Sequence, residues 1–130
     1  ILISAAEELR TLEYSQRLRD RDRNRLGTEN VSTGRAIFEQ ALVGGAQSSG
    51  RKIGPLIVGN RADIMTLDSS HPALSARSQD GWLDGWIFAA NSPAISDVWV
   101  GGKHLVSHGK HHKRKQIRLL YAQTIKRLTA

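Results

Sequence analysis

The chain changes its hydrophobic period within the stretch Ile53-Gly54-Pro55-Leu56-Ile57-Val58-Gly59-Asn60-Arg61-Ala62-Asp63-Ile64-Met65-Thr66-Leu67-Asp68. Pro55–Val58 and Ala62–Asp68 are short apolar runs, the first ended by Gly59-Asn60 and the second by Ser69-Ser70. Short runs bounded by such turn residues are typical of strands. The residues before this stretch follow a helical period, so we expect helices upstream and a sheet downstream.

Two helices are predicted in the upstream part. The first covers residues 4–26, because Ser4 and Glu7 have the spacing of a capping box and Gly27 can supply the left-handed residue that ends a helix. The second covers residues 33–47, where apolar and small side chains recur three and four positions apart.

The downstream part has the pattern of a small sheet followed by a helix. Trp86–Ala90 is predicted to be a strand, and Ser96–Val100 and Lys103–Ser107 are predicted to form a hairpin around Gly101-Gly102. Together with the two strands in the opening stretch, these segments predict a compact sheet over residues 53–109. The chain then continues into an amphipathic helix over about residues 115–128.

Composition limits the class of protein. The chain has 130 residues, which suits one domain or pieces of two, and 39% of them are hydrophobic, which disfavours wholesale disorder. It has no cysteine, which excludes disulfides, thiolate metal sites and cysteine nucleophiles. No apolar run approaches the roughly 18 residues of a membrane-spanning helix. No secretory leader is expected, because Glu7, Glu8 and Arg10 follow the apolar start closely, and the default setting is cytoplasmic.

The positive charge is concentrated at the end of the chain. Residues 1–97 carry 11 Lys and Arg against 12 Asp and Glu, whereas residues 98–130 carry eight Lys and Arg and no acid. The densest cluster, Lys110–Lys115, could contact nucleic acid, but it contains no aromatic residue and we favour a solvated connection into the last helix. The arginines of Arg17–Arg25 alternate with Asp20 and Asp22, which favours an ion-paired helix end in solvent.

The chemistry-bearing side chains do not form a recognisable constellation. His104 and His108 would lie about 13 Å apart on a strand, too far for one metal ion. We expect turn and strand-edge roles for four aspartates and core positions for the tryptophans, and the sequence lacks a Gly-x-Ser-x-Gly motif and a phosphate-binding loop. No catalytic, cofactor-binding or metal-ligating residue is therefore assigned. The residues considered are His71, His104, His108, His111, His112, Asp63, Asp68, Asp80, Asp84, Trp82, Trp86 and Trp99.

The opening stretch resembles the Gly-x-Leu-x-x-Gly-x-x-Ala-Asp-(apolar)-x-x-Leu-Asp signature of the metal-dependent amidohydrolases. In that superfamily the signature marks the return of the chain from a catalytic TIM barrel to a small β-sandwich built from both chain ends. Asp97–Lys103 and His108–His111 are similar to the family's closing hairpin. The resemblance covers nearly the whole chain.

Three further segments are similar to the formimidoylglutamate deiminase family of histidine degradation: Glu7–Arg19, Ala41–Gln47 and Asp68–Leu74. This resemblance implies deimination of N-formimino-L-glutamate to N-formyl-L-glutamate and ammonia, with zinc or a similar divalent metal as cofactor. The family's metal ligands, a His-x-His pair, two further histidines and an aspartate, are not present here. The resemblance places the aspartate a few residues before Ile1, so we expect a fragment that binds no metal and is inactive alone.

The expected fold class is therefore α/β: a C-terminal fragment of an amidohydrolase TIM barrel, part of the small β-sandwich domain and a C-terminal helix. We expect residues 1–50 to be terminal helices of the barrel, residues 51–112 the sandwich portion and residues 113–130 the C-terminal helix. The missing barrel would cover one helix face, so the fragment should expose it and dissolve poorly. The residues of that face are Ile37, Phe38 and Leu42.

The expected partners are a small-molecule substrate, formimino-glutamate, and further copies of the full-length enzyme in a homo-oligomer, with no nucleic acid and no membrane. Two alternatives remain open. One is another amidohydrolase-superfamily deaminase, acting on a guanine-type or amidine substrate. The other is a small basic module that binds nucleic acid through Lys110–Lys115.

Overall fold

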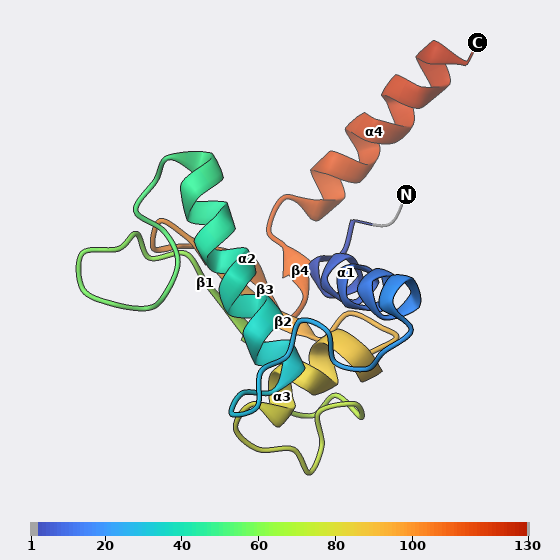
Figure 1. The fold of residues 1–130 in the computed structure, drawn as a ribbon. Helices are drawn as coiled ribbons and strands as arrows, with labels where there is room; N and C mark the ends of the chain where they lie inside the picture. Colours follow the sequence, from blue (N-terminus) through green and yellow to red (C-terminus); the bar gives the residue numbers. More distant parts are fainter. Residues whose placement is uncertain (1–2, 130) are drawn as a thin grey trace.

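The computed structural model describes residues 3–129, and Ile1, Leu2 and Ala130 lie outside this description. Two helices lead the chain, a small antiparallel sheet with a helical insertion follows, and a last helix extends away from the rest of the molecule (Figure 1). The helices are α1 (Ala5–Asp20), α2 (Thr33–Ser49), α3 (Gly81–Asp84), the π-helix η1 (Gly85–Ala89) and α4 (Arg114–Leu128). The strands are β1 (Ile64–Leu67), β2 (Ile95–Val100), β3 (Lys103–Ser107) and β4 (Lys110–His111).

Helix α1 begins where the sequence predicts and ends earlier. Its cap is Ser4, whose Oγ accepts a hydrogen bond from the backbone N–H of Glu7 at 3.3 Å. The predicted end at residue 26 is wrong, because Arg21 adopts a left-handed conformation (φ 53°) directly after Asp20. Gly27 therefore does not end the helix.

Helix α2 confirms the second predicted helix. Ser32 caps it by accepting a hydrogen bond from the backbone N–H of Arg35 at 3.2 Å. The helix continues to Ser49, and Gly50, with φ 63°, supplies the left-handed residue beyond its end.

The sheet has the strand order β1-β2-β3-β4 with every neighbouring pair antiparallel. Its centre is the predicted hairpin, in which β2 and β3 are joined by Gly101 (φ 56°) and Gly102 (φ 76°). Two successive residues with positive φ suit a type I′ turn, whose twist matches that of the paired strands. The hairpin prediction is confirmed.

The predicted strand Pro55–Val58 is wrong. These residues lie in a surface loop that is closed by a hydrogen bond from Arg61 N–H to the Lys52 carbonyl at 2.8 Å. Inside the loop the Asn60 side-chain amide donates to the Pro55 carbonyl at 2.9 Å. These hydrogen bonds satisfy several backbone groups within the loop. No strand within residues 3–129 pairs with Pro55–Val58, so its apolar sequence does not form a strand.

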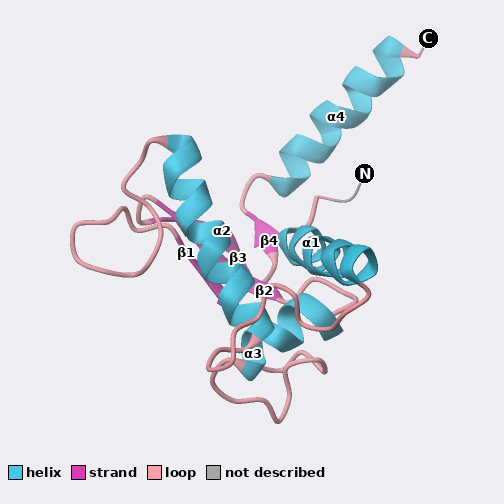
Figure 2. Ribbon diagram, in the orientation of Figure 1, coloured by secondary structure: helices cyan, strands magenta, loops and turns pink. Residues whose placement is uncertain are grey.

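The predicted strand Trp86–Ala90 is also wrong, because the segment is helical (Figure 2). The N–H of Ala90 donates to the carbonyl of Gly85 at 2.9 Å, the i to i+5 bond of a π-helix. Trp86 and Ile87 are both buried although they are adjacent in sequence. A short continuous apolar run cannot distinguish a buried strand from a buried helix, and here the helix is formed.

The core lies among α1, α2 and the α3–η1 segment. Its central residues are Ile37 from α2 and Trp86 and Ile87 from η1, with Leu74 from the preceding loop. The predicted exposure of Ile37 is wrong, since it is only 2% exposed, and Phe38 is half-buried with its ring edge-on to Trp86. The described residues are a mixture of helices and one sheet, and neither a barrel nor a second sheet is formed within them.

Candidate functional site

The two segments that carry the amidohydrolase resemblance are bonded to each other. Oδ1 of Asp63 accepts a hydrogen bond from Gly101 N–H at 2.6 Å, and the Ala62 carbonyl accepts one from Gly102 N–H at 2.8 Å. Arg61 Nε lies 2.9 Å from the same Asp63 oxygen. We call these residues, Arg61, Ala62, Asp63, Gly101 and Gly102, the clasp. The clasp fixes the start of β1 to the turn of the hairpin.

The clasp gives a physical reason for Asp63 and Gly101 to occur together. Gly101 needs a left-handed backbone, and a Cβ there would lie 3.1 Å from the Arg61 guanidinium. The Asp63 carboxylate uses its Oδ1 for both a backbone N–H and an arginine. Asp63 is therefore held as a structural acceptor at a strand edge, as predicted from its position in the sequence.

A second polar cluster lies on the sheet between β2 and β3. Ser96 Oγ donates to Asp97 Oδ2 at 2.5 Å, and His104 Nε2 lies 2.8 Å from Asp97 Oδ1. The His104 ring stacks on Trp99 with 4.4 Å between ring centroids. The Ser96 hydrogen bond and, less strongly, His104 lower the pKa of the Asp97 carboxyl, against an opposing effect of desolvation.

The Asp97–His104 pair is a cross-strand contact. The side chains of His104 and Asp97 are 43% and 21% exposed, so water reaches both partners. A cross-strand hydrogen bond in this setting stabilises a hairpin modestly and favours its register.

The other histidines have separate roles. His71 Nε2 lies 2.8 Å from Ser92 Oγ, and its Nδ1 accepts a hydrogen bond from Ala73 N–H at 3.2 Å. His111 and His112 stack on each other with 4.5 Å between centroids.

The histidines and acids in the described part of the chain do not converge on one point. Across residues 3–129, no group of three or more His, Cys, Asp and Glu side chains is placed to hold a metal ion. A hydrolytic zinc site needs about three protein ligands. The residues described here thus do not fit the metal that the family resemblance implies.

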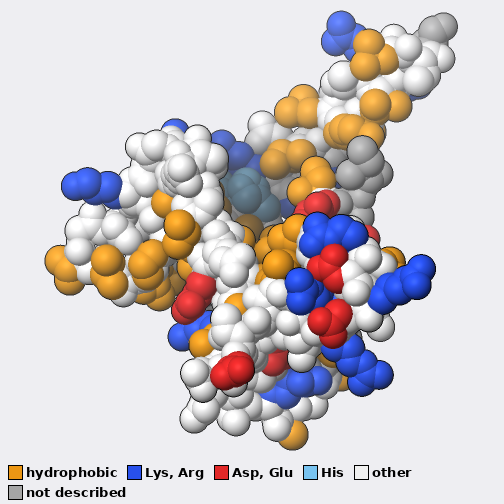
Figure 3. All heavy atoms as spheres, in the orientation of Figure 1, with side chains coloured by type: hydrophobic (Ala, Val, Ile, Leu, Met, Phe, Trp, Pro, Cys, Tyr) orange, Lys and Arg blue, Asp and Glu red, His pale blue; other side chains and the backbone are white. Residues whose placement is uncertain are grey.

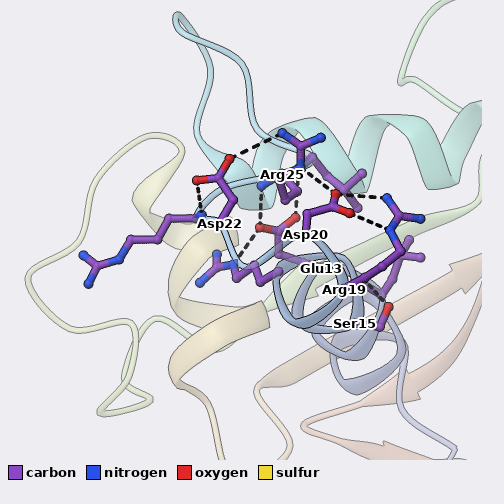
Figure 4. Close-up of polar contacts among 10 residues, drawn as sticks. Glu13, Ser15, Arg19, Asp20, Asp22 and Arg25 are labelled. Carbon is purple, nitrogen blue, oxygen red and sulfur yellow. Dashed lines mark hydrogen bonds and ion pairs between the residues drawn. The ribbon is translucent and has the colours of Figure 1, made fainter.

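The most buried charge is one that sequence analysis missed. Glu13 on α1 is 0% exposed, and its carboxylate accepts hydrogen bonds from Arg17 Nε at 2.7 Å and from the backbone N–H groups of Arg25 and Leu26, each at 3.0 Å. These bonds draw the chain after α1 back against the helix (Figure 4). The one sequence signal is that Glu13 lies seven residues after the small apolar Ala6 and so shares its helix face.

The arginine-rich end of α1 is ion-paired, as predicted. Asp20 Oδ1 lies 2.7 Å from Arg19 Nε, and Asp20 Oδ2 lies 2.8 Å from Arg25 Nε (Figure 4). The pKa of Asp20 is lowered to about 2, first by the hydrogen bond from Arg19. Both arginines are exposed, so the network organises the loop more than it stabilises the fold.

Trp86 lies where the sequence predicts, whereas Asp84 has a different role from the one predicted. Trp86 is a core residue, as predicted, and is 4% exposed. Asp84, for which a turn or strand-edge role was expected, instead accepts a hydrogen bond from Gly34 N–H at 2.7 Å. It therefore joins α3 to the N-terminus of α2, where a carboxylate is favoured by the helix dipole.

The basic segment Lys110–Lys115 covers β4, a turn and the start of α4. It is a largely exposed connection, which agrees with the favoured interpretation from the sequence. Among residues 3–129, no helix combines the length and hydropathy needed to cross a membrane.

The sequence of the chain was compared with those of known proteins. No family model matches the chain. Formimidoylglutamate deiminase from Pseudomonas aeruginosa is 41% identical over 126 residues, which are 96% of this chain and 28% of that protein. The chain is similar in sequence to one part of this deiminase. The resemblance predicted from the sequence is confirmed, and the chain spans about 28% of the length of the relative it matches.

Solved structures of amidohydrolases also superpose on the chain. A crystal structure of an amidohydrolase from Brucella melitensis superposes with a TM-score of 0.89 and 40% identity, covering 99% of this chain and 28% of that one. An adenosine deaminase from Xanthomonas campestris with bound zinc superposes with a TM-score of 0.72 and 24% identity, covering 92% of this chain and 26% of that one. The second comparison supports the fold alone.

Proposed function

We propose that this chain is a structural part of an amidohydrolase that deiminates N-formimino-L-glutamate. The observation that supports the proposal most strongly is the 41% identity to formimidoylglutamate deiminase over nearly the whole chain. The clasp adds a physical reason, because it joins both signature segments through hydrogen bonds that depend on their residue types.

The proposed reaction is hydrolysis of a C–N bond. A water oxygen adds to the formimino carbon, the bond to the terminal nitrogen breaks, and that nitrogen leaves as ammonia with protons from water. The product is N-formyl-L-glutamate. The chain matches only 28% of the Pseudomonas deiminase. We expect the groups that carry out this chemistry to lie in the rest of that protein.

The proposed division of the chain follows its elements. Residues 1–50 would provide the terminal helices of the catalytic barrel, residues 51–112 a portion of the small β-sandwich, and residues 113–130 the C-terminal helix. Zinc or a similar divalent metal would be bound by residues other than those described here, and the complete enzyme would be a homo-oligomer.

The test is a chimera in which this chain replaces the matching 126 residues of the Pseudomonas deiminase. We expect the chimera to release ammonia from N-formimino-L-glutamate and to prefer it over guanine and adenosine, while the 130-residue chain alone releases none. A folded chimera that prefers another substrate would support a different deaminase. A folded chimera without any turnover would contradict the proposal.

A competing nucleic-acid function is checked with the chain alone. We expect the binding of duplex DNA to be weak, independent of sequence and abolished by moderate salt, because Lys110–Lys115 offers charge without an aromatic platform. Tight, sequence-selective binding would favour the binding-module alternative.

A further inference from the structure

Helix α4 is not covered by any other part of residues 3–129. All of its 15 residues are exposed, and it projects away from the sheet and from the other helices (Figure 1). A helix of this length is marginally stable in water by itself and normally depends on packing of an apolar face. We therefore expect α4 to pack against a surface that residues 3–129 do not provide.

The apolar side chains of α4 lie mainly on one stripe. Ile117, Leu120, Tyr121, Ile125 and Leu128 recur at helical spacing and are between 40% and 76% exposed. Hydrophobic atoms gather along the helix in the space-filling view (Figure 3). Leu119, which is 66% exposed, points away from the stripe, because it lies about 100° around the helix from Leu120.

The positive charge of α4 disfavours one candidate partner for this stripe, a second copy of the helix. Helix α4 carries five Lys and Arg residues and no acid. Pairing it with α4 of a second copy would bring ten cations together along two short helices, and like charges at this distance oppose association. A second copy is therefore a poor occupant.

The comparison with the Brucella amidohydrolase favours a specific occupant. The superposition covers 99% of this chain, which includes α4, and only 28% of the solved chain. Helix α4 thus has its counterpart inside a much larger folded polypeptide. We propose that the apolar stripe of α4 docks into an apolar groove on the remaining part of the amidohydrolase fold. This inference rests on the proposed function.

The test uses a matched pair of variants in the chimera described above. Leu120→Gln changes the stripe, and Leu119→Gln makes the same change on the neighbouring residue outside it. We expect Leu120→Gln to lower the melting temperature by about 2–4 °C or more, because it places an amide in an apolar groove, and Leu119→Gln to change it by less than about 1 °C. Equal melting temperatures in an active chimera would overturn the docking inference and leave the proposed function standing.

Two further measurements on the 130-residue chain separate the other occupants. Binding to vesicles of phosphatidylglycerol but not phosphatidylcholine, lost in Leu120→Gln, would assign the stripe to an anionic lipid surface and overturn the proposal. Self-association that is lost in Leu120→Gln and kept in Leu119→Gln would assign it to a second copy, with the same consequence. A chimera that does not fold would contradict both the proposed function and the docking inference, because the segment would then not fit the remaining polypeptide.

Discussion

Glu13 is a buried charge whose partners all come from within thirteen residues of it. Burying a carboxylate is costly unless its oxygens are hydrogen-bonded, and here one arginine and two backbone N–H groups meet that need. The result is that the loop after α1 has a defined course without regular secondary structure. A side chain missed by periodicity thus holds the loop that follows α1.

Replacing Glu13 with Ala should destabilise the chain more than any change at an exposed acid. The backbone N–H groups of Arg25 and Leu26 and the Arg17 guanidinium would lose their acceptor together, which we expect to lower the free energy of unfolding by about 3 kcal/mol. Urea denaturation measures this directly. Glu29→Ala, at an exposed turn position, is the control and should change the value by less than about 0.5 kcal/mol.

The lowered pKa of Asp97 predicts the direction of one pH effect. A carboxyl whose pKa is lower in the folded state contributes stability above its unfolded pKa of about 4, and this contribution is lost as the pH falls through the folded pKa. Between about pH 5 and pH 2, wild type should therefore lose more unfolding free energy than Asp97→Asn. Denaturant titrations at each pH provide the comparison, and parallel curves for the two proteins would show that the bonds to Ser96 and His104 contribute nothing.

At the scale of elements, we expect a glycine-to-alanine substitution to have opposite effects near the two ends of α2. Ala normally stabilises a helix interior relative to Gly by about 0.5–1 kcal/mol, and a Cβ added to Gly45 would meet no atom within 4 Å. A Cβ on Gly34 would lie 2.6 Å from Asp84 Oδ1 and 2.9 Å from the Asp84 backbone nitrogen. Gly45→Ala should therefore raise the melting temperature, and Gly34→Ala should lower it by separating α2 from α3. Stabilisation by both would mean that this junction is loose.

The clasp is the other junction between elements that can be tested. Asp63→Ala removes the acceptor of Gly101 N–H and the partner of Arg61, and we expect it to lower the free energy of unfolding by about 1 kcal/mol. Amide hydrogen exchange should locate the change at Gly101 and along β1–β2 and not in α1. Asp80→Ala is the matched control, because its nearest cation, Arg35, is 3.7 Å away and exposed.

Elements specified by neighbouring residues were predictable from the sequence. The Ser4 and Ser32 caps and the Gly101-Gly102 turn each depend on groups a few residues apart, and all three are found. Pro55–Val58 and Trp86–Ala90 have strand-like composition, but their structure depends on distant partners. Trp86 packs on Phe38, nearly fifty residues earlier in the chain, and sequence patterns do not carry that information.

At the scale of the whole molecule, one part is well packed and other parts expose apolar surface. The core residues among α1, α2 and η1 are at most 7% exposed, whereas every residue of α4 is exposed. The sequence predicted the resemblance to amidohydrolases through a motif whose Ala62 and Asp63 lie in the clasp. It could not predict which faces are covered: Ile37, expected at the surface, is in the core, and the apolar residues left at the surface lie elsewhere.

One such surface is the loop before β1, where Leu56, Ile57 and Val58 are 72%, 62% and 105% exposed. Adjacent apolar side chains in water favour association, so the 130-residue chain should sediment as a concentration-dependent mixture of species. The double variant Leu56→Ser and Val58→Ser should reduce this association and leave the unfolding midpoint unchanged, because neither side chain packs against the core. Leu74→Ser, at a position 1% exposed, is the contrasting control and should lower the midpoint strongly. Sedimentation velocity and urea denaturation test the two halves of this prediction, and a double variant that associates as wild type does would place the adhesive surface elsewhere.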